Sequence, residues 1–272
     1  MPELPEVETV CRGLRNKVLG RTILNVEQRR PNLRYPFPEG FAELLTGQTI
    51  ETIERRAKYI IIPLTGGTWI THLGMSGQIR LYDQRPEALG KHEHLFVTFD
   101  DGTAMGYTDP RRFGYMQWVN QGQQLFHNLG VEPLSPALTP EYLEREFTGS
   151  RRPIKTALLD QYPIAGLGNI YVCEALWLAK ISPKNQSGDI SLSKLGELCQ
   201  AIREVLDRAI AAGGSTLKDH AQVDGKSGYF QHQFHVYNQA SSGCSRDECH
   251  GEIAQIRQAG RSTFYCPVCQ GG

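Results

Sequence analysis

EPLSPALTP, residues 132–140, divides this 272-residue chain into two parts with different sequence patterns. Its three prolines are typical of a domain boundary. Before it, short apolar runs between glycine-bearing turns predict strands at 22–30, 50–64, 67–73, 78–83, 94–99, 103–108 and 113–119. After it, helical periodicity predicts helices at 140–147, 153–161, 169–180 and 191–212. Strands followed by helices indicate an α+β protein of more than one domain, beginning with an antiparallel sandwich or barrel.

Both ends of the chain add further elements. A leading helix that ends at Gly20 is predicted by five apolar residues at helical spacing: Val7, Val10, Cys11, Leu14 and Val18. The polar, glycine-bearing segment 219–230 predicts a long loop, and loops of this length in compact proteins are often functional. Residues 231–272 predict short strands around four cysteines.

The composition is that of an ordinary soluble globular protein, with 40% hydrophobic and 21% charged residues. No apolar run approaches the roughly 20 residues of a membrane span, and the acidic N-terminus is unlike a signal peptide, so we expect a cytoplasmic protein. The net charge of zero argues mildly against a nucleic-acid partner. Arginine pairs could nevertheless build a local basic face: Arg29-Arg30, Arg55-Arg56, Arg111-Arg112 and Arg151-Arg152.

The chain starts Met1-Pro2-Glu3. If Met1 is removed, Pro2 presents a secondary amine, and an α-amino group titrates near pH ~8. Such an amine can attack electrophilic carbon and form an iminium intermediate, with the Glu3 carboxylate as a proton-transfer partner. Many chains start in this way without any catalytic meaning, so the hypothesis depends on the rest of the sequence.

Four of the seven cysteines lie close together near the C-terminus, as Cys244-x4-Cys249-x16-Cys266-x2-Cys269. Two close pairs separated by a hairpin-length segment are typical of a structural zinc site. We therefore predict one bound zinc ion, with His250 as an alternative ligand beside Cys249. Four thiolates would leave no open coordination position, so this ion should stabilise the fold and not catalyse.

Four further motifs have a structural and a functional interpretation. The turn Gly166-Leu-Gly-Asn169 suits a phosphate at a helix N-terminus, or simply connects two helices. Arg111 and Arg112 beside Phe113 suit insertion into DNA, or flank a core phenylalanine. Met75 and His72 could lie on an exposed loop or fill the core. Lys58 before a buried strand could contact a phosphate or extend to solvent from a sheet edge.

Ten segments together resemble one family closely, the bacterial formamidopyrimidine-DNA glycosylases. They are PELPEVETV (2–10), RRAKYII (55–61), HLGMSG (72–77), KHEH (91–94), YTDPRRFG (107–114), IK (154–155), GLGNIY (166–171), GGSTLKD (213–219), DGKSGYF (224–230) and GRSTFYCPVCQ (260–270). The resemblance implies an N-terminal β-sandwich with a leading helix at 1–132, a helix-two-turn-helix domain at 133–220, and a lesion-capping loop with a zinc finger at 221–272. Leu4 favours this branch over endonuclease VIII, which usually begins Pro-Glu-Gly-Pro-Glu.

The same resemblance assigns catalytic roles. Pro2 is similar to the family's nucleophile, which attacks C1′ of a damaged nucleotide, and Glu3 to its general acid and base. Lys58 resembles the lysine of β-elimination, which also contacts phosphate. Arg261 resembles the arginine of δ-elimination, which also binds phosphate. The implied reaction removes 8-oxoguanine or formamidopyrimidines from duplex DNA and then cleaves the abasic strand.

Other positions match the DNA-contact residues of the family. The positions matching phosphate or DNA contacts are His72, His92, Arg111, Arg151, Asn169 and Tyr237. Those matching the side chains that fill the gap left by a flipped nucleotide are Met75, Arg111 and Phe113, and an enzyme that extrudes a base needs such a filler. Those matching the lesion pocket are Lys155, Lys218, Glu6 and Glu174, with the 219–230 loop.

Two departures from the family pattern bear on these expectations. The first cysteine pair has four intervening residues where the family normally has two, which could change how Arg261 reaches the site. Cys173 stands where a small or acidic residue is common in the family.

Three alternative functions stay open: a pyrimidine-specific glycosylase like endonuclease VIII, a non-catalytic protein that binds damaged DNA, and a zinc-ribbon RNA-binding factor. A monomer is the simplest expectation.

Overall fold

The computed structural model describes residues 1–123, 126, 128–215, 223–225 and 227–271, and it forms two compact units. The first unit comprises Met1–Leu125 and Ala212–Tyr229, and the second comprises Phe126–Ala211 and Phe230–Gly272. The segment 212–229 groups with the N-terminal unit because its backbone bonds there, as in the hydrogen bond from Leu81 N to Val223 O (2.9 Å). Spatial compactness thus divides the chain differently from the three expected domains, whose boundaries at 132 and 220 remain a prediction.

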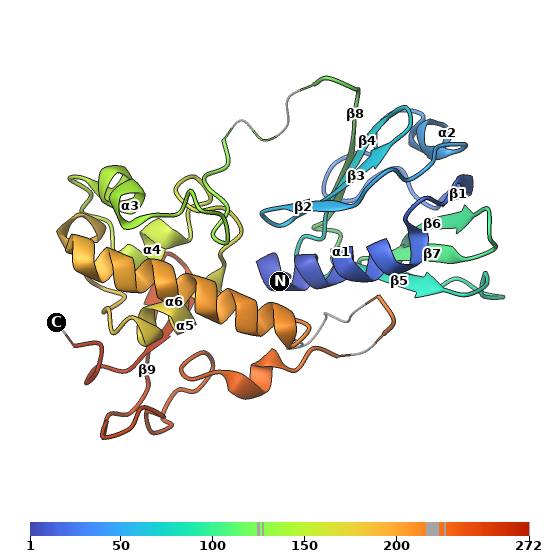
Figure 1. The fold of residues 1–272 in the computed structure, drawn as a ribbon. Coiled ribbons are helices and arrows are strands. Elements are labelled where there is room, and N and C mark those ends of the chain that lie inside the picture. Colours follow the sequence, from blue (N-terminus) through green and yellow to red (C-terminus); the bar gives the residue numbers. More distant parts are fainter. Residues whose placement is uncertain (124–125, 127, 216–222, 226, 272) are drawn as a thin grey trace. The chain divides into compact units, whose positions relative to one another are not determined.

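The first unit is an antiparallel sandwich of two four-stranded sheets (Figure 1). One sheet has the order β1-β6-β7-β5 and the other has the order β2-β3-β4-β8. The strands are β1 (Ile23–Gln28), β2 (Glu54–Arg56), β3 (Tyr59–Leu64), β4 (Gly67–His72), β5 (Gln78–Tyr82), β6 (Glu93–Phe99), β7 (Ala104–Thr108) and β8 (Tyr115–Val119). All seven predicted strand regions are confirmed, and the region 50–64 contains two strands because Ala57 turns the chain with a positive φ of 53°.

Helix α1 (Leu4–Val18) supplies the buried face that was predicted from its apolar spacing. That face joins residues of both sheets, including Ile60, Trp69 and Phe99, in one hydrophobic core. A short helix α2 (Phe41–Leu45) was not predicted, because five residues are too few to show a helical period. Its Phe41 packs edge-on against Trp69, with ring centroids 6.0 Å apart.

The second unit is mainly helical. It contains α3 (Pro140–Phe147), α4 (Ile154–Leu158), α5 (Asn169–Leu178), α6 (Leu192–Ala211), the short 3₁₀ helices η1 (Ser187–Asp189) and η2 (Phe230–Gln233), and the hairpin strands β9 (Ala254–Gln258) and β10 (Arg261–Tyr265). The long helix α6 packs against α3 and α5 (Figure 1). Strand β10 also packs against α5. The four predicted helices are confirmed, although α4 ends at Leu158, earlier than the predicted 161.

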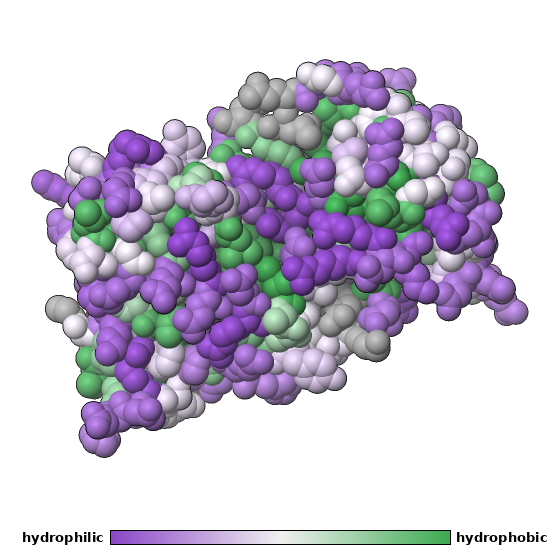
Figure 2. All heavy atoms as spheres, in the orientation of Figure 1, coloured by the Kyte–Doolittle hydropathy of each residue, from purple (hydrophilic) through white to green (hydrophobic). Residues whose placement is uncertain are grey.

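Hydrophilic residues cover most of the surface that each unit presents in Figure 2. Across the described ranges, none of the helices is long and apolar enough to cross a lipid bilayer. The apolar residues of α1 and α6 serve the core instead, since one face of each helix is buried.

The core contribution of α1 can be tested with two leucines near its C-terminal end. Leu14 is fully buried, whereas Leu19 is 48% exposed. We expect Leu14→Ala to lower the free energy of unfolding by about 2–5 kcal/mol, because it leaves a cavity in the core. The matched control Leu19→Ala should change it by less than about 0.5 kcal/mol. Urea unfolding followed by circular dichroism measures both, and equal losses would contradict the assigned packing.

Candidate active site

The predicted nucleophile and its acid partner directly precede α1. Pro2 and Glu3 are buried, and Glu3 is the N-cap residue of the helix. A capping box joins Glu3 to Glu6, in which the Glu3 backbone N–H donates to Glu6 Oε2 (2.8 Å). Two otherwise unsatisfied N–H groups of the first turn are thereby bonded, so the backbone beside Pro2 is held in one conformation.

The other oxygen of Glu6 binds the segment that follows α6. Glu6 Oε1 accepts hydrogen bonds from the backbone N–H (2.8 Å) and hydroxyl (3.0 Å) of Ser215. Gly214, with a φ of 78°, lies against the same carboxylate. Glu6 therefore joins residues 214–215 to the start of α1. Its role in a lesion pocket stays a prediction, and Lys218 lies outside the described residues.

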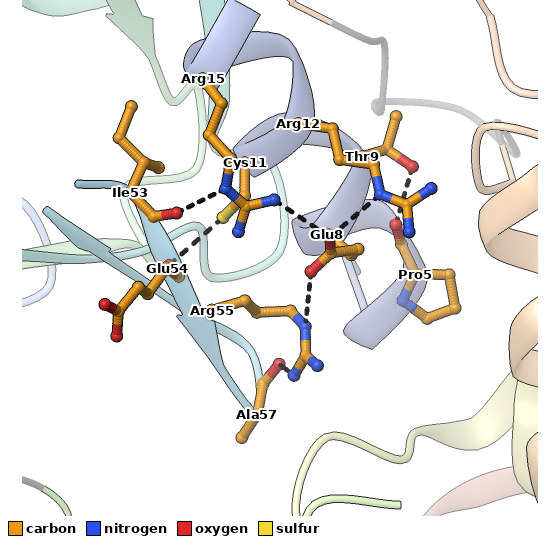
Figure 3. A network of polar contacts seen from close by, with 10 residues as sticks. All are labelled: Pro5, Glu8, Thr9, Cys11, Arg12, Arg15, Ile53, Glu54, Arg55 and Ala57. Atoms are coloured by element: carbon orange, nitrogen blue, oxygen red, sulfur yellow. Dashed lines mark hydrogen bonds and ion pairs between the residues drawn. The ribbon is translucent and has the colours of Figure 1, made fainter. Parts of the chain in front are cut away.

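Lys58 lies in the tight turn between β2 and β3 and is only 8% exposed. Arg55 holds this turn from one side, since its Nη1 donates to Ala57 O (3.1 Å) (Figure 3). The same guanidinium donates through Nε to Glu8 Oε2 (3.1 Å). Because Glu8 belongs to α1, a direct chain of polar contacts links the helix that carries the N-terminus to the turn that carries Lys58.

The sequence reasoning missed the role of Glu8. This carboxylate also binds Arg12 (3.0 Å) and Arg15 (3.3 Å), and Arg15 donates to Ile53 O (2.6 Å), as Figure 3 shows. Burial alone would raise the pKa of Glu8, but the hydrogen bond from Arg12 and the charges of Arg55 and Arg15 outweigh it and lower that pKa. The sequence held one signal for this role. Glu8 lies in the motif PELPEVETV, one helical turn beyond Leu4.

His72 ends strand β4 and stacks on Tyr115, with ring centroids 5.4 Å apart. Burial, followed by the charges of Lys58 and Arg34, lowers the pKa of His72 to about 4. The Gly74 N–H donates to His72 Nδ1 (3.0 Å), which assigns the single proton of the neutral ring to Nε2. His72 is therefore a neutral N–H donor beside Lys58.

Two neighbouring loops carry the three residues assigned to gap filling. Met75 is 36% exposed and Phe113 is 41% exposed. The Arg111 guanidinium lies over the Phe113 ring, 4.9 Å from its centroid. These side chains are thus not core residues, which removes the structural interpretation left open above. His92 is also exposed, in keeping with a surface contact.

Helix α5 of the second unit organises another group of predicted residues. Asn169 is its first residue and donates through Nδ2 to Ser262 O (2.8 Å), beside the exposed Arg261 at the start of β10. The structure thereby brings Asn169 and Arg261 to one place. Arg151 is exposed, before α4. Their contacts with DNA stay predictions.

Glu174, also on α5, is buried and bonds to the backbone of the segment before the finger. Its oxygens accept from the N–H groups of His235 (2.9 Å), Val236 (3.0 Å) and Tyr237 (2.8 Å). Burial raises the pKa of Glu174, although these three bonds act in the opposite direction. The carboxylate fixes the half-buried Tyr237, whereas Lys155 is completely buried on α4. The assignment of Glu174 and Lys155 to a lesion pocket stays a prediction, and so does the DNA contact of Tyr237.

The four C-terminal cysteines form one cluster in which all sulfurs lie within 4.8 Å of one another. Cys244 and Cys269 have sulfurs 3.8 Å apart, and Cys249 and Cys266 have sulfurs 3.6 Å apart. Within the described part of the chain, His250 does not belong to the cluster. Four sulfurs at this spacing could hold a metal ion.

The longer first knuckle packs against α5. Arg246 lies over the ring of Trp177, 4.4 Å from its centroid, and donates to Trp177 O (2.7 Å). The indole in turn stacks on His235 at 4.2 Å and donates to Cys244 Sγ (3.4 Å). The additional residues of the knuckle therefore anchor the finger to the helix that carries Asn169 and Glu174.

Comparisons with known proteins agree with this architecture. A family model of the formamidopyrimidine-DNA glycosylase N-terminal domain matches residues 1–116, and one of the formamidopyrimidine-DNA glycosylase H2TH domain matches residues 129–221. The chain belongs to the formamidopyrimidine-DNA glycosylase family. The resemblance drawn from the sequence is confirmed, and so is the expected combination of β-sandwich, helix-two-turn-helix domain and cysteine cluster.

Full-length relatives extend this match. The chain is 49% identical to the formamidopyrimidine-DNA glycosylase of Phenylobacterium zucineum over 286 aligned residues, and 48% identical to that of Sinorhizobium fredii over 296, covering 99% of this chain and 100% of each relative. Among solved structures, a Lactococcus lactis FPG mutant in complex with a Fapy-dG containing DNA is 38% identical, with a TM-score of 0.91 over 100% of both chains. The L. lactis protein with an abasic site containing DNA is 36% identical, with the same TM-score and coverage.

The protonation state of His72 is open to direct measurement. We expect its ring to titrate with a midpoint of about 4, against an ordinary value of 6.5. Between these pH values the unfolded chain binds more protons than the folded one, so His72 should lower the free energy of unfolding as pH falls from 6.5 to 4. NMR titration of the histidine ring signals, assigned with His72→Gln, measures this midpoint. A midpoint near 6.5 would contradict the burial of a neutral ring.

Proposed function

We propose that this protein is a DNA-repair glycosylase and abasic-site lyase that excises oxidised purines through its N-terminal proline. The observation that carries the proposal is the structure of the N-terminus. Pro2 and Glu3 are buried directly before α1. Glu6 bonds that helix to segment 214–215, and Glu8 bonds it through Arg55 to the Lys58 turn. The backbone beside Pro2 is thereby held in one conformation, as the positioning of a nucleophile requires.

The proposed reaction follows from an unprotonated Pro2 amine. Its lone pair attacks C1′ of the damaged nucleotide, and the glycosidic bond breaks as the base leaves with a proton. The sugar ring then opens and the nitrogen and C1′ form an iminium ion, which withdraws electrons and acidifies the C2′ proton. Loss of that proton expels the 3′ phosphate, and a second elimination expels the 5′ phosphate. Glu3 is the adjacent group that can move these protons.

The proposed DNA contacts combine charged and neutral donors. His72 offers a neutral N–H next to Lys58, and Asn169 lies beside Arg261 on the second unit. Among the described residues, five acidic but only two basic side chains are buried: Glu3, Glu6, Glu93, Asp109 and Glu174 against Lys58 and Lys155. The surface is therefore more basic than the net charge of zero indicates, which answers the objection raised from composition.

One observation supports a second substrate class. The L. lactis FPG structure with an oxidized pyrimidine containing DNA has a TM-score of 0.90 to this chain and 38% identity. We propose oxidised purines as the main substrates, since the matching relatives are formamidopyrimidine-DNA glycosylases. Excision of 8-oxoguanine opposite cytosine, compared with excision of thymine glycol under the same conditions, decides between the two preferences.

We further propose that the cysteine cluster holds one structural zinc ion. A tetrahedral zinc with Zn–S bonds of about 2.3 Å places its sulfurs about 3.8 Å apart. The sulfur pairs Cys244–Cys269 and Cys249–Cys266, at 3.8 Å and 3.6 Å, fit this requirement. The ion would supply folding free energy to the finger that presents Arg261, and four thiolates would leave it no position for substrate. A cytoplasmic location beside the bacterial chromosome completes the proposal.

Borohydride trapping tests the lyase. We expect the chain without Met1 to form a covalent adduct with abasic DNA, because borohydride reduces the iminium to a stable amine. A chain with one residue retained before Pro2 should trap about a thousandfold less, since its proline nitrogen is an amide without nucleophilic character. Proteolytic removal of that residue is the matched control and should restore trapping. Equal trapping with and without the extra residue, or none by either form, would contradict the assignment.

Elemental analysis tests the metal. We expect one zinc ion per chain, and we expect Cys269→Ala to abolish it and to lower the midpoint of thermal unfolding, because metal binding is coupled to folding of the finger. Cys199→Ala is the control, since Cys199 is buried on α6 away from the cluster and should leave the zinc content unchanged. A wild-type protein isolated without zinc, or a zinc-containing wild type with the same thermal midpoint as Cys269→Ala, would argue against the structural ion.

A further inference from the structure

Asp109 is a completely buried carboxylate between two loops with exposed tips. The Met75 loop, residues 73–77, follows β4, and the Phe113 loop, residues 109–114, precedes β8. Neither the family motifs nor the catalytic chemistry gives Asp109 a role. Its surroundings give it one, because polar groups from both loops converge on its two oxygens.

Each oxygen of Asp109 accepts two hydrogen bonds. Oδ1 accepts from the Ser76 hydroxyl (2.5 Å) and the Arg112 N–H (3.0 Å). Oδ2 accepts from the Gly114 N–H (2.8 Å) and the Tyr107 hydroxyl (3.2 Å). Asp109 thus bonds both to its own loop and, through Ser76, to the Met75 loop.

Ser76 and the backbone of Asp109 complete this connection. The buried Ser76 hydroxyl oxygen also accepts from the Arg111 N–H (3.1 Å), so it links the two loops a second time. The Asp109 N–H donates to His92 O (3.0 Å), and the Asp109 carbonyl bonds to His94 Nε2 (2.9 Å). Because His94 belongs to β6, the carboxylate is fixed to the sheet and both loops are fixed to the carboxylate.

Glycines allow the two loops to lie in direct contact. Gly74 has a φ of 63°, and a Cβ at this position would overlap the backbone of Phe113 and Gly114. A Cβ at Gly114 would overlap the Tyr107 hydroxyl. No side chain can therefore separate the loops at this point, and a displacement of one loop must displace the other.

We infer that Asp109 is the positioning residue that holds Met75, Arg111 and Phe113 in one arrangement for insertion into the DNA stack. This inference rests on the proposed function, in which a base is everted and its place is filled. Eversion loses a few kcal/mol of stacking and pairing, which inserted side chains must offset. They can do so only if they reach the gap together, and misplacement by about 1 Å can reduce a rate by about a hundredfold.

The substitution Asp109→Asn keeps the size of the side chain but removes its charge and one of its two acceptor groups. An amide offers one acceptor and one donor group where the carboxylate offers two acceptors. If the NH₂ group faces Arg112 and Ser76, two donors meet there, the NH₂ group and the Arg112 N–H. If it faces Gly114 and Tyr107, the NH₂ group and the Gly114 N–H are the two donors that meet. In either orientation one backbone group of the Phe113 loop loses its acceptor, so this loop should shift.

The test compares two substrates that differ in their need for eversion. Single-turnover excision of 8-oxoguanine from duplex DNA requires the base to leave the stack. Borohydride trapping on single-stranded abasic DNA does not, and it uses the same Pro2 chemistry. We expect Asp109→Asn to slow duplex excision by about tenfold or more while trapping stays within about twofold of the wild type. Equal losses in both assays, or no loss in duplex excision, would overturn the inference.

Two further variants control for folding and for charge. Ser76→Ala removes only the hydroxyl that links the loops, and it should slow duplex excision while leaving trapping on single-stranded DNA unchanged. If Asp109→Asn does not fold, this variant tests the inference in its place. Asp101→Asn makes the same change at a carboxylate that binds Arg21 (3.0 Å) in a distant hairpin, and both assays should match the wild type. A selective loss in Asp101→Asn would also overturn the inference. Wild-type protein inactive in both assays would instead disprove the proposed function.

Discussion

The carboxylate of Glu6 is the group on which the arrangement of the N-terminal unit depends. It accepts the N–H of Glu3 on one oxygen and both polar groups of Ser215 on the other, so it closes the first turn of α1 and holds a segment more than 200 residues away in sequence. Helix N-termini attract negative charge because their first N–H groups are unpaired. Here that attraction places a fixed carboxylate, and with it a second segment of chain, beside the residue proposed as the nucleophile.

Acidic side chains perform the same task at three other places. Glu8 links α1 to the Lys58 turn, Asp109 links the Met75 and Phe113 loops, and Glu174 fixes residues 235–237 to α5. In each case a carboxylate oxygen, which can accept several hydrogen bonds, collects donors from segments that are distant in sequence. A protein whose exposed side chains must attract phosphate can use its acidic residues in this way inside the fold, where they do not repel DNA.

Periodicity and turn residues predicted the strands and the main helices closely, because these depend on local spacing. The cysteine cluster could also be predicted from the sequence, since metal ligands have a characteristic spacing. The roles of Glu8, Asp109 and Arg246 could not be predicted from the sequence. Each depends on which distant backbone groups the fold brings near, such as Ala57 O for Arg55 or the Trp177 ring for Arg246. Family resemblance located the exposed residues Met75 and Phe113, but it gave no reason for the buried network beneath them.

The capping box has a consequence for the freedom of the proposed nucleophile. Because the Glu3 N–H is bonded to Glu6, the peptide plane that joins Pro2 to Glu3 is held by the helix. The nitrogen of Pro2 is part of a five-membered ring, so it cannot rotate about the bond to its own Cα. One torsion, about the Cα–C bond of Pro2, then remains to set where the amine lies. Few conformations need to be excluded before attack, and the entropy of orienting the amine is largely lost when the protein folds, before DNA binds.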